Sequence, residues 1–289
     1  MTFRLDVIAS LSDAGKPGRP NEDRFGANRT AAFVLDGATG LGDRQFMTSH
    51  DTDAAWIADY ATRRMAVELT PEVEVADVLR AISADARTLF DATAGEQPRY
   101  AWPAAALAGL RVTERGLEFF GLGDSVVYLL HDDGRAETLT ALPQAFEREQ
   151  AAARAHLSRL GGIGAAGALV HDPQTLQDLR ASRARQNTPE GWVWSLGLVP
   201  EAADHLALQT IPLSGGATAV ICSDGLADLV SLYKTTDAAN LVRRAATAGL
   251  GSLIAELRHL EREVDPDGLK YPRFKQSDDT TAMLVRVEG

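Results

Sequence analysis

The chain contains a single cysteine, Cys222, among its 289 residues. One thiol cannot form an internal disulfide or a cysteine-built zinc site, so we interpret Cys222 as a buried structural thiol. The sequence also lacks any run approaching the roughly 18 apolar residues of a membrane helix. Its N-terminal residues show no small-residue cleavage site, so we read 3–11 as a strand and expect a cytoplasmic protein without a membrane span.

Positive charge is scarce: the chain has 29 Lys and Arg and 40 Asp and Glu, which gives a formal net charge of −11. A nucleic-acid partner requires a basic face to meet the phosphates, so this balance argues against one. The acidic excess fits either a soluble, self-repelling surface or carboxylates gathered around divalent metal ions. The positions of the acids, rather than the composition, have to decide between these two readings.

The order of the expected elements indicates an α+β fold. Helical spacing of apolar residues predicts helices at 51–69, 75–92, 237–248 and 251–263. Apolar runs predict strands at 3–11, 31–37, 104–112, 117–121, 126–131, 192–196, 205–213, 217–222 and 281–287. Because strands and helices come in separate runs, we expect packed layers rather than alternating βαβ units. We treat 1–289 as a single domain with a flap-like helical insert at about 143–190.

Five acidic stretches place Asp or Glu at the edge of an expected strand or in a loop. They are RPNEDRF (19–25), VLDGATG (34–40), FGLGDSV (120–126), VICSDGL (220–226) and QSDDTTAMLV (276–285). A single Asp-Gly is ordinarily a turn, and we interpret Asp132-Asp133-Gly134 as one. Five stretches together indicate a divalent-metal centre, since such ions take oxygen ligands on rigid strand ends. Two ions can make hydroxide from water and neutralise charge on a phosphoryl group.

In this order, NED, DG, GDS, SDG and DD-T-T resemble the metal-dependent protein phosphatase family of type 2C, over roughly residues 5–287. The resemblance implies a four-layer α-β-β-α sandwich, in which two antiparallel sheets are flanked by helices. It implies two Mg²⁺ or Mn²⁺ ions, with a third in several members, and oxygen ligands suit either metal. A metal-bridging water would attack phosphoserine or phosphothreonine directly, without a covalent phosphoenzyme.

The resemblance also assigns roles to the acids, and Asp36 matches the carboxylate that bridges both metals. Glu22 and the Gly37 carbonyl match ligands of the second metal, and Asp23 matches the acid that orients its waters. These four residues lie within two of the five acidic stretches.

Four further acids match family residues associated with the first metal or with the weaker third metal. Asp224 matches a ligand of the first metal, and Asp124 an acid associated with the third. In the last stretch the family usually has Asp-Asn, so Asp278 takes the ligand position and Asp279 the Asn position. The pair can also be read the other way, so both are named and Asp278 is favoured.

The sequence departs from the family pattern at two places. Ala38 stands where the family often has a His, proposed as the general acid for the leaving alkoxide, and losing such a group can cost on the order of 10²–10⁴-fold in rate. The phosphate-binding Arg usually lies four residues before the Glu, whereas Arg19 lies three before Glu22. We still expect Arg19 to bind the phosphate, with Lys16 as a stand-in.

The loop KYPRFKQSDD (270–279) places Lys275, with Lys270 and Arg273, beside the acids, where a basic group could meet a substrate phosphate.

From the acidic stretches and the family resemblance, we predict a metal-dependent phosphoric monoester hydrolase that acts on phosphorylated proteins. A catalytically weak binding or regulatory module is one alternative, which Ala38 favours. The other is a phosphatase for a small phosphorylated molecule, in which the insert closes off the metals. The sequence encodes neither the physiological substrate nor the oligomeric state.

Overall fold

The computed structural model describes residues 3–164 and 167–288. The strands are β1 (Arg4–Asp13), β2 (Arg24–Ala27), β3 (Ala31–Gly37), β4 (Ala104–Thr113), β5 (Gly116–Leu122), β6 (Val126–His131), β7 (Ala136–Thr140), β8 (Leu196–Gly197), β9 (Ala207–Ile211), β10 (Ala217–Cys222) and β11 (Thr280–Glu288). The helices are α1 (Asp53–Glu68), α2 (Val75–Ala94), α3 (Ala145–Leu160), α4 (Pro173–Ala184), α5 (Asp224–Ser231), α6 (Ala238–Ala248) and α7 (Leu250–His259). Short helical turns are η1 (Arg99–Ala101), η2 (Leu169–His171), η3 (Pro200–His205) and η4 (Leu260–Val264).

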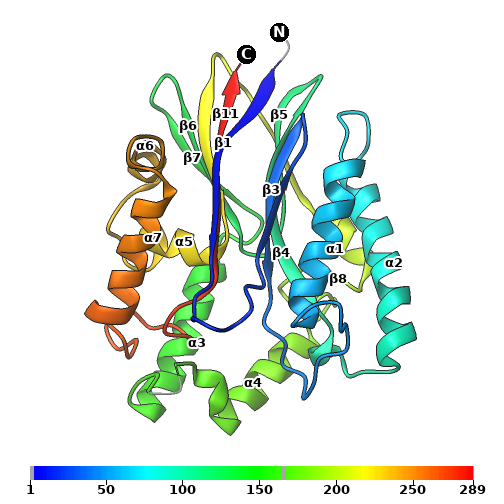
Figure 1. Ribbon diagram of the computed structural model, residues 1–289, viewed down its shortest axis with the longest axis vertical. Coiled ribbons are helices and arrows are strands. Elements are labelled where there is room, and N and C mark those ends of the chain that lie inside the picture. Colours follow the sequence, from blue (N-terminus) through cyan, green and yellow to red (C-terminus); the bar gives the residue numbers. More distant parts are fainter. Residues whose placement is uncertain (1–2, 165–166, 289) are drawn as a thin grey trace.

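Two antiparallel sheets stack face to face in the middle of the molecule (Figure 1). One has the strand order β1-β11-β10-β6-β7, and the other β2-β3-β4-β5-β9, with β8 paired to β4. Helices α1 and α2 cover the outer face of the second sheet, and α5, α6 and α7 cover that of the first. The predicted four-layer α-β-β-α sandwich is therefore confirmed.

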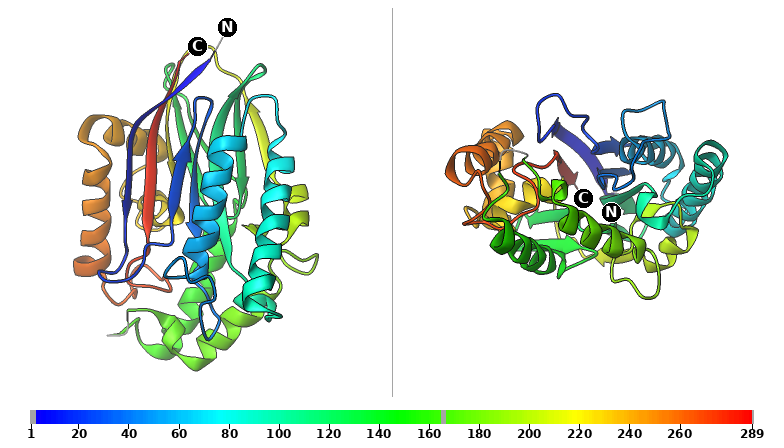
Figure 2. Two further views of the ribbon diagram at one scale, coloured as in Figure 1. Left: turned by 45° about the vertical axis from the view of Figure 1, so that its right-hand side comes forward. Right: turned by 90° about the horizontal axis from the view of Figure 1, so that it is seen from below.

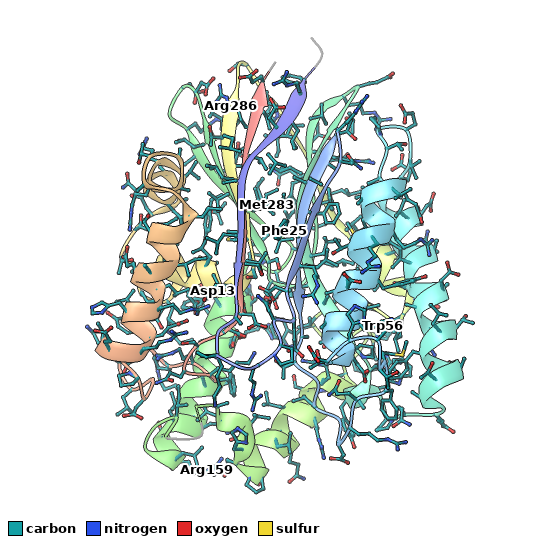
Figure 3. All side chains as sticks on the ribbon, viewed as in Figure 1. Asp13, Phe25, Trp56, Arg159, Met283 and Arg286 are labelled. Atoms are coloured by element: carbon teal, nitrogen blue, oxygen red, sulfur yellow. The ribbon has the colours of Figure 1, made fainter. Side chains whose placement is uncertain are left out.

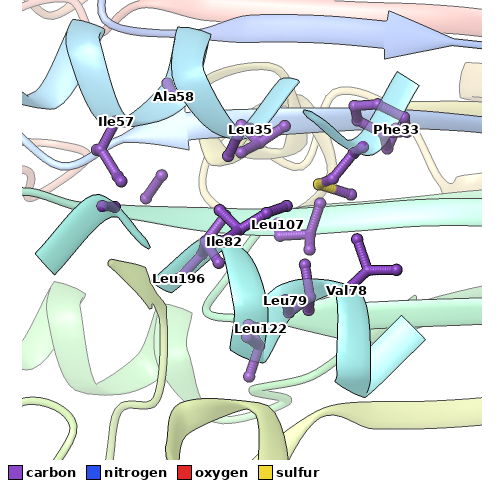
Figure 4. Packing of buried hydrophobic residues seen from close by; sticks show 14 of the residues in the cluster. Phe33, Leu35, Ile57, Ala58, Val78, Leu79, Ile82, Leu107, Leu122 and Leu196 are labelled. Atoms are coloured by element: carbon purple, nitrogen blue, oxygen red, sulfur yellow. The ribbon is translucent and has the colours of Figure 1, made fainter. Parts of the chain in front are cut away.

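In strand β3, apolar residues fill consecutive positions rather than alternating with polar ones. Successive side chains of a strand point to opposite faces. Phe33 and Leu35 pack under α1 and α2 (Figure 4), whereas Ala32 and Val34 face the other sheet. Because both faces are covered, every position up to Leu35 is buried. The strand ends at Gly37, directly after Asp36, its one polar residue.

Residues 143–190, where we predicted an insert, contain two helices, α3 and α4, which lie across one end of the sandwich (Figure 2). We refer to these two helices and the residues between them as the flap. Arg159 of α3 pairs with Asp172, whose carboxylate also caps α4 by accepting the N–H of Thr175 at 2.8 Å. Arg159 is labelled at that end in Figure 3, and both chain termini lie at the opposite end in Figure 1. The flap therefore covers the end of the sandwich that is remote from the termini.

The strand predicted at 192–196 is wrong apart from Leu196, which pairs with β4 in the two-residue β8. Tertiary contacts replace a sheet there, because Asn187 exchanges hydrogen bonds with Ser195 and the Trp194 ring stacks on His205 at 3.6 Å. Within the residues that the structure describes, no helix is long and apolar enough to cross a membrane.

Candidate metal centre

Five chain segments that carry the predicted acids converge beneath the flap. Strand β3 ends at Asp36 and Gly37, and Ser223 after β10 leads directly into α5, whose first residue is Asp224. The other three segments are connections: the β1–β2 loop with Glu22 and Asp23, the β5–β6 turn with Asp124, and the residues before β11 with Asp278 and Asp279. Antiparallel pairing makes this convergence possible. Where neighbouring strands run in opposite directions, the end of one strand lies beside the start of the next, at the same end of the sheet.

Two glycines of the acidic motifs allow the segments to approach closely. A Cβ atom at Gly37 would lie 2.4 Å from the backbone oxygen of Glu22. A Cβ atom at Gly225 would lie 2.4 Å from the backbone oxygen of Asp279. No side chain fits at such distances, so each glycine lets one acidic segment lie directly against another.

The carboxyl groups at this end raise one another's pKa values. Burial, followed by the charges of Asp224, Asp23 and Asp124, raises the pKa of Asp36 well above its ordinary range. Burial and the charge of Asp124 raise the pKa of Asp224 to about 7, although a hydrogen bond with Asp36 opposes the shift. Desolvation and like charge both disfavour the ionised form, so the cluster favours either protons or cations.

Asp23 is the most deeply buried of the predicted acids. Both of its carboxylate oxygens are buried without a hydrogen-bond partner of normal geometry in the described part of the chain. Burial and the charge of Asp279 raise the pKa of Asp23 to about 8, although the nearby Ser223 hydroxyl opposes the shift. A buried carboxylate without a partner is costly, so a bound ion or its water shell fits these residues.

Sequence reasoning missed one acid, Glu149 of α3 in the flap. Its carboxylate oxygen lies within 4.8 Å of oxygens of both Asp124 and Asp224, so these three residues could hold an ion. The residue as a whole is exposed, but the protein around its carboxylate partly desolvates it. This desolvation, with the charges of Asp224 and Asp124, raises the pKa of Glu149 to about 8. No motif marks Glu149, because its place depends on how α3 docks over the strand ends.

Asp278 and Asp279 have different surroundings. Asp279 accepts the backbone N–H of Gly15 at 2.9 Å through one oxygen and that of Glu22 at 2.7 Å through the other. Asp278 instead accepts the Nζ of Lys275 at 2.7 Å. Asp279 therefore anchors the β1–β2 loop, whereas Asp278 faces the other charged groups of the cluster.

Lys275 is the basic residue of the 270–279 loop that reaches the acids. Besides Asp278, its Nζ donates to Thr39 Oγ1 at 3.0 Å. Burial opposes its charge, but the carboxylates of Asp278, Glu22 and Asp224 outweigh burial and raise the pKa of Lys275. Arg273 does not point to the acids, since its guanidinium is buried against Asp265 at 3.0 Å.

Two arginines are candidates for the substrate phosphate, and the second was missed in the sequence. Arg19 is exposed on the β1–β2 loop, as is Lys16. Arg183 of α4 is half-buried, and its Nη1 is fully buried without a hydrogen-bond partner among the described residues. Burial lowers the pKa of Arg183, while the carboxylates of Glu22 and Asp124 oppose this change, so its charge lies near the acidic cluster.

A family model described as Protein phosphatase 2C matches residues 14–257. The chain belongs to the protein phosphatase 2C family. The matched range includes Glu22, Asp36, Asp124 and Asp224 and ends before Asp278. No curated protein matches the sequence.

Solved structures with the same fold span the whole chain at low sequence identity. The PPM Ser-Thr phosphatase MsPP from Mycobacterium smegmatis, in complex with cacodylate, is 20% identical, with 98% of each chain covered and a TM-score of 0.53. The catalytic domain of the serine/threonine protein phosphatase PstP, in complex with two manganese ions, is 17% identical, with 100% of each chain covered and a TM-score of 0.57. The Mycobacterium tuberculosis PstP/Ppp structure is 17% identical, covers 100% of this chain and 99% of that one, and has a TM-score of 0.52. At these identities the similarity establishes the phosphatase 2C fold.

Ala38 marks the place where this phosphatase 2C chain lacks the histidine that the family often carries. The Ala38 N–H donates to the Ala104 carbonyl at 2.9 Å, which fixes the loop after β3. His50, the nearest histidine in the sequence, hydrogen-bonds to Asp59 at 3.1 Å and to Ser49 at 2.9 Å instead. The side chain of His50 is therefore held by Asp59 of α1 and by Ser49.

A cavity of about 400 Å³ opens beside the acids, between α3, α5 and the 272–275 loop. Asp124, Glu149, Asp224 and Asp278 line one part of it. The remaining walls include apolar and aromatic side chains, among them those of Tyr128, Leu142, Phe146, Val230 and Phe274. Its volume falls within the range of roughly 300–1,000 Å³ that small-molecule pockets occupy.

Proposed function

We propose that this chain is a metal-dependent phosphoric monoester hydrolase acting on phosphoserine and phosphothreonine in proteins. The observation that carries the proposal is the convergence of buried and half-buried, mutually repelling carboxylates around Asp36. Among them, the two buried oxygens of Asp23 have no hydrogen-bond partner of normal geometry in the described residues. A divalent cation relieves both the repulsion and the missing contact. Membership of the protein phosphatase 2C family supports the same reaction.

The ligand sets follow from the acidic segments. Asp36, Asp224 and Asp278 would hold one ion, and Glu22, Asp36 and the Gly37 carbonyl the other. Carboxylate and carbonyl oxygens suit both Mg²⁺ and Mn²⁺. Two manganese ions in the PstP structure, which has the same fold, support a two-ion centre.

The remaining acids would support these ligands. Asp23 would orient waters of the second ion, and Asp124 with Glu149 would hold a third ion beside Asp224. Asp279 holds two backbone N–H groups with its two oxygens, so it would act by positioning Glu22 rather than as a ligand. This division favours Asp278 over Asp279 as the ligand of the first ion.

When bound, the ions supply a nucleophilic hydroxide and neutralise charge on the phosphoryl group. The reaction then requires no nucleophilic side chain, consistent with the fully buried Cys222. Cationic side chains of this chain would position the phosphate. Arg19 is exposed at the rim, Arg183 lies near Glu22 and Asp124, and Lys275 lies between Asp278 and Thr39.

Hydrolysis assays on the full chain test the proposal. Turnover of p-nitrophenyl phosphate and of a phosphothreonine peptide is measured with Mn²⁺, with Mg²⁺ and with EDTA, for wild type and Asp36→Asn. Asp133→Asn is the matched control, because Asp133 is an exposed turn residue of the β6–β7 hairpin. We expect metal-dependent turnover of both substrates, abolished in Asp36→Asn and unchanged in Asp133→Asn.

The other outcomes identify the rival functions. Turnover of the aryl ester alone would point to a small phosphorylated molecule as substrate or to a missing proton donor. No turnover with any metal, from folded protein, would overturn the enzyme assignment and favour a binding module. Wild-type turnover by Asp36→Asn would show that the ligand assignment is wrong.

A further inference from the structure

We propose that Lys275 is a built-in competitor for the divalent ions. Its ammonium group joins Asp278 to Glu22 through the Thr39 hydroxyl, and an ion that binds Oδ1 of Asp278 has to displace it. The inference rests on the metal-binding part of the proposed function. It adds a residue that sets how tightly the centre holds its ions.

Three hydrogen bonds define this bridge. Lys275 Nζ donates to Asp278 Oδ1 at 2.7 Å and to Thr39 Oγ1 at 3.0 Å. The Thr39 hydroxyl in turn donates to Glu22 Oε2 at 2.8 Å. Asp278 and Glu22 come from the two ligand sets of the proposed centre, so one ammonium group connects both sets.

The charge of Lys275 makes the bridge competitive. An ammonium group and a divalent ion are both positive, so they repel each other when they share the carboxylate of Asp278. Without an ion, the single charge of Lys275 offsets part of the repulsion among the clustered acids. With an ion bound, the flexible lysine stem lets Nζ move away, and the side chain, 35% exposed, has solvent beside it.

The fold fixes the point from which the lysine reaches the acids. Lys275 pairs with Ala168 of the flap in an isolated bridge. On either side, the Leu169 N–H donates to the Phe274 carbonyl at 2.8 Å and the Gln276 N–H to the Gly167 carbonyl at 3.0 Å. The backbone of 274–276 is therefore attached to the flap. Only the side chain of Lys275 can move when an ion binds Asp278.

Calorimetric titration of the full chain with Mn²⁺ alone tests the competition without relying on turnover. Lys275→Met removes the charge and keeps an unbranched side chain, whereas Lys275→Arg keeps the charge. Lys270→Met is the matched control, because Lys270 lies on the same loop, is exposed, and packs over the Tyr271 ring at 4.9 Å. We expect the Mn²⁺ dissociation constant to fall about tenfold or more in Lys275→Met and to stay near wild type in the other two.

Thermal unfolding provides the second readout. Lys275→Met should have a lower Tm than wild type in EDTA, because the acids lose their compensating charge. Saturating Mn²⁺ should raise its Tm by more than it raises that of wild type, since tighter binding stabilises the folded state further. A merely structural lysine would lower both Tm values together. If Lys275→Met does not fold, Lys275→Gln takes its place in both measurements.

Equal or weaker Mn²⁺ binding by the folded, neutral variant would overturn the competition while leaving the metal centre and the phosphatase proposal intact. Failure of wild type and variants alike to bind Mn²⁺ at millimolar concentration would overturn both proposals. Tighter Mn²⁺ binding by Lys275→Met, together with a wild type that has no phosphatase activity, would support the competition and contradict the proposed reaction.

Discussion

The carboxylate of Asp279 accepts a hydrogen bond of 2.7 Å from the backbone N–H of Glu22, 257 residues away in the chain. Its other oxygen accepts the N–H of Gly15 at 2.9 Å. One side chain therefore holds both ends of the loop that presents Glu22 to the cluster. An asparagine, which the family usually has here, offers one oxygen acceptor where Asp279 offers two.

Replacing Asp279 separates this anchoring role from its charge. Both Asp279→Ala and Asp279→Asn remove one negative charge from the cluster, but only Asp279→Asn keeps an acceptor for the loop. We expect Asp279→Ala to be less stable than Asp279→Asn by about 1–2 kcal/mol, the cost of leaving a half-buried N–H unsatisfied. Urea unfolding in EDTA measures the difference. Equal stability of the two variants would contradict the anchoring role.

The raised pKa values predict how the stability of the protein in EDTA depends on pH. The pKa values of Asp23 and Asp224 are raised to about 8 and about 7 in the folded state, against about 4 when unfolded. Between these values the folded state binds protons that the unfolded state has lost, so stability falls as pH rises from about 5 to about 8. The Tm in EDTA across this range measures the effect. A Tm that rises with pH would contradict it.

Two comparisons sharpen the pH prediction. Asp224→Asn cannot ionise at that position, so its Tm in EDTA should fall less steeply with pH than that of wild type. With saturating Mn²⁺ the slope should reverse, because the ligands must lose their protons to bind the ion. An unchanged slope with Mn²⁺ would indicate that these carboxylates do not bind it.

Much of the fold could be predicted because its signals are local. The apolar run that forms β3 and ends at Asp36, and the apolar spacing of α1 and α2, lie within single segments. Strand β2 was not predicted, because it has only four residues and alternate positions are exposed. The expected strand at 192–196 is wrong because the stacking of Trp194 on His205 lies outside any local pattern.

Part of the candidate site could be predicted from local sequence signals, and part could not. Acids beside glycine or serine at strand ends could be found, because an antiparallel sandwich brings strand ends together. Glu149 and Arg183 could not, since the docking of α3 and α4 decides which face of each helix meets the acids. The Lys275–Thr39 contact joins residues 236 positions apart, and no spacing rule links them.

Arg183 offers a test of how the substrate phosphate is held. Its buried Nη1 lacks a partner among the described residues, and a phosphate oxygen would supply one. We expect Arg183→Ala to lower kcat/KM for a phosphothreonine peptide by about tenfold or more, mainly through KM, without weakening Mn²⁺ binding. Arg19→Ala, measured in parallel, compares the two candidate arginines.

The matched control for Arg183 is Arg185→Ala, since Arg185 is exposed directly after α4. Its kinetics should remain those of wild type. Equal losses in Arg183→Ala and Arg185→Ala would indicate a general effect on the flap. A lower kcat with unchanged KM in Arg183→Ala would contradict a role in binding the phosphate.

Ala38 predicts a dependence on the leaving group. Nitrophenolate leaves without a proton, whereas the alkoxide of threonine requires one, so an enzyme without the general acid should favour aryl over alkyl phosphates. Ala38→His should therefore raise kcat for the phosphothreonine peptide by about tenfold or more and change that for p-nitrophenyl phosphate much less. Ala38→Gln, of similar bulk but without a titratable group, is the control for a change in shape. If Ala38→His and Ala38→Gln respond alike, or if wild type already cleaves both esters at similar rates, another group of the site donates the proton.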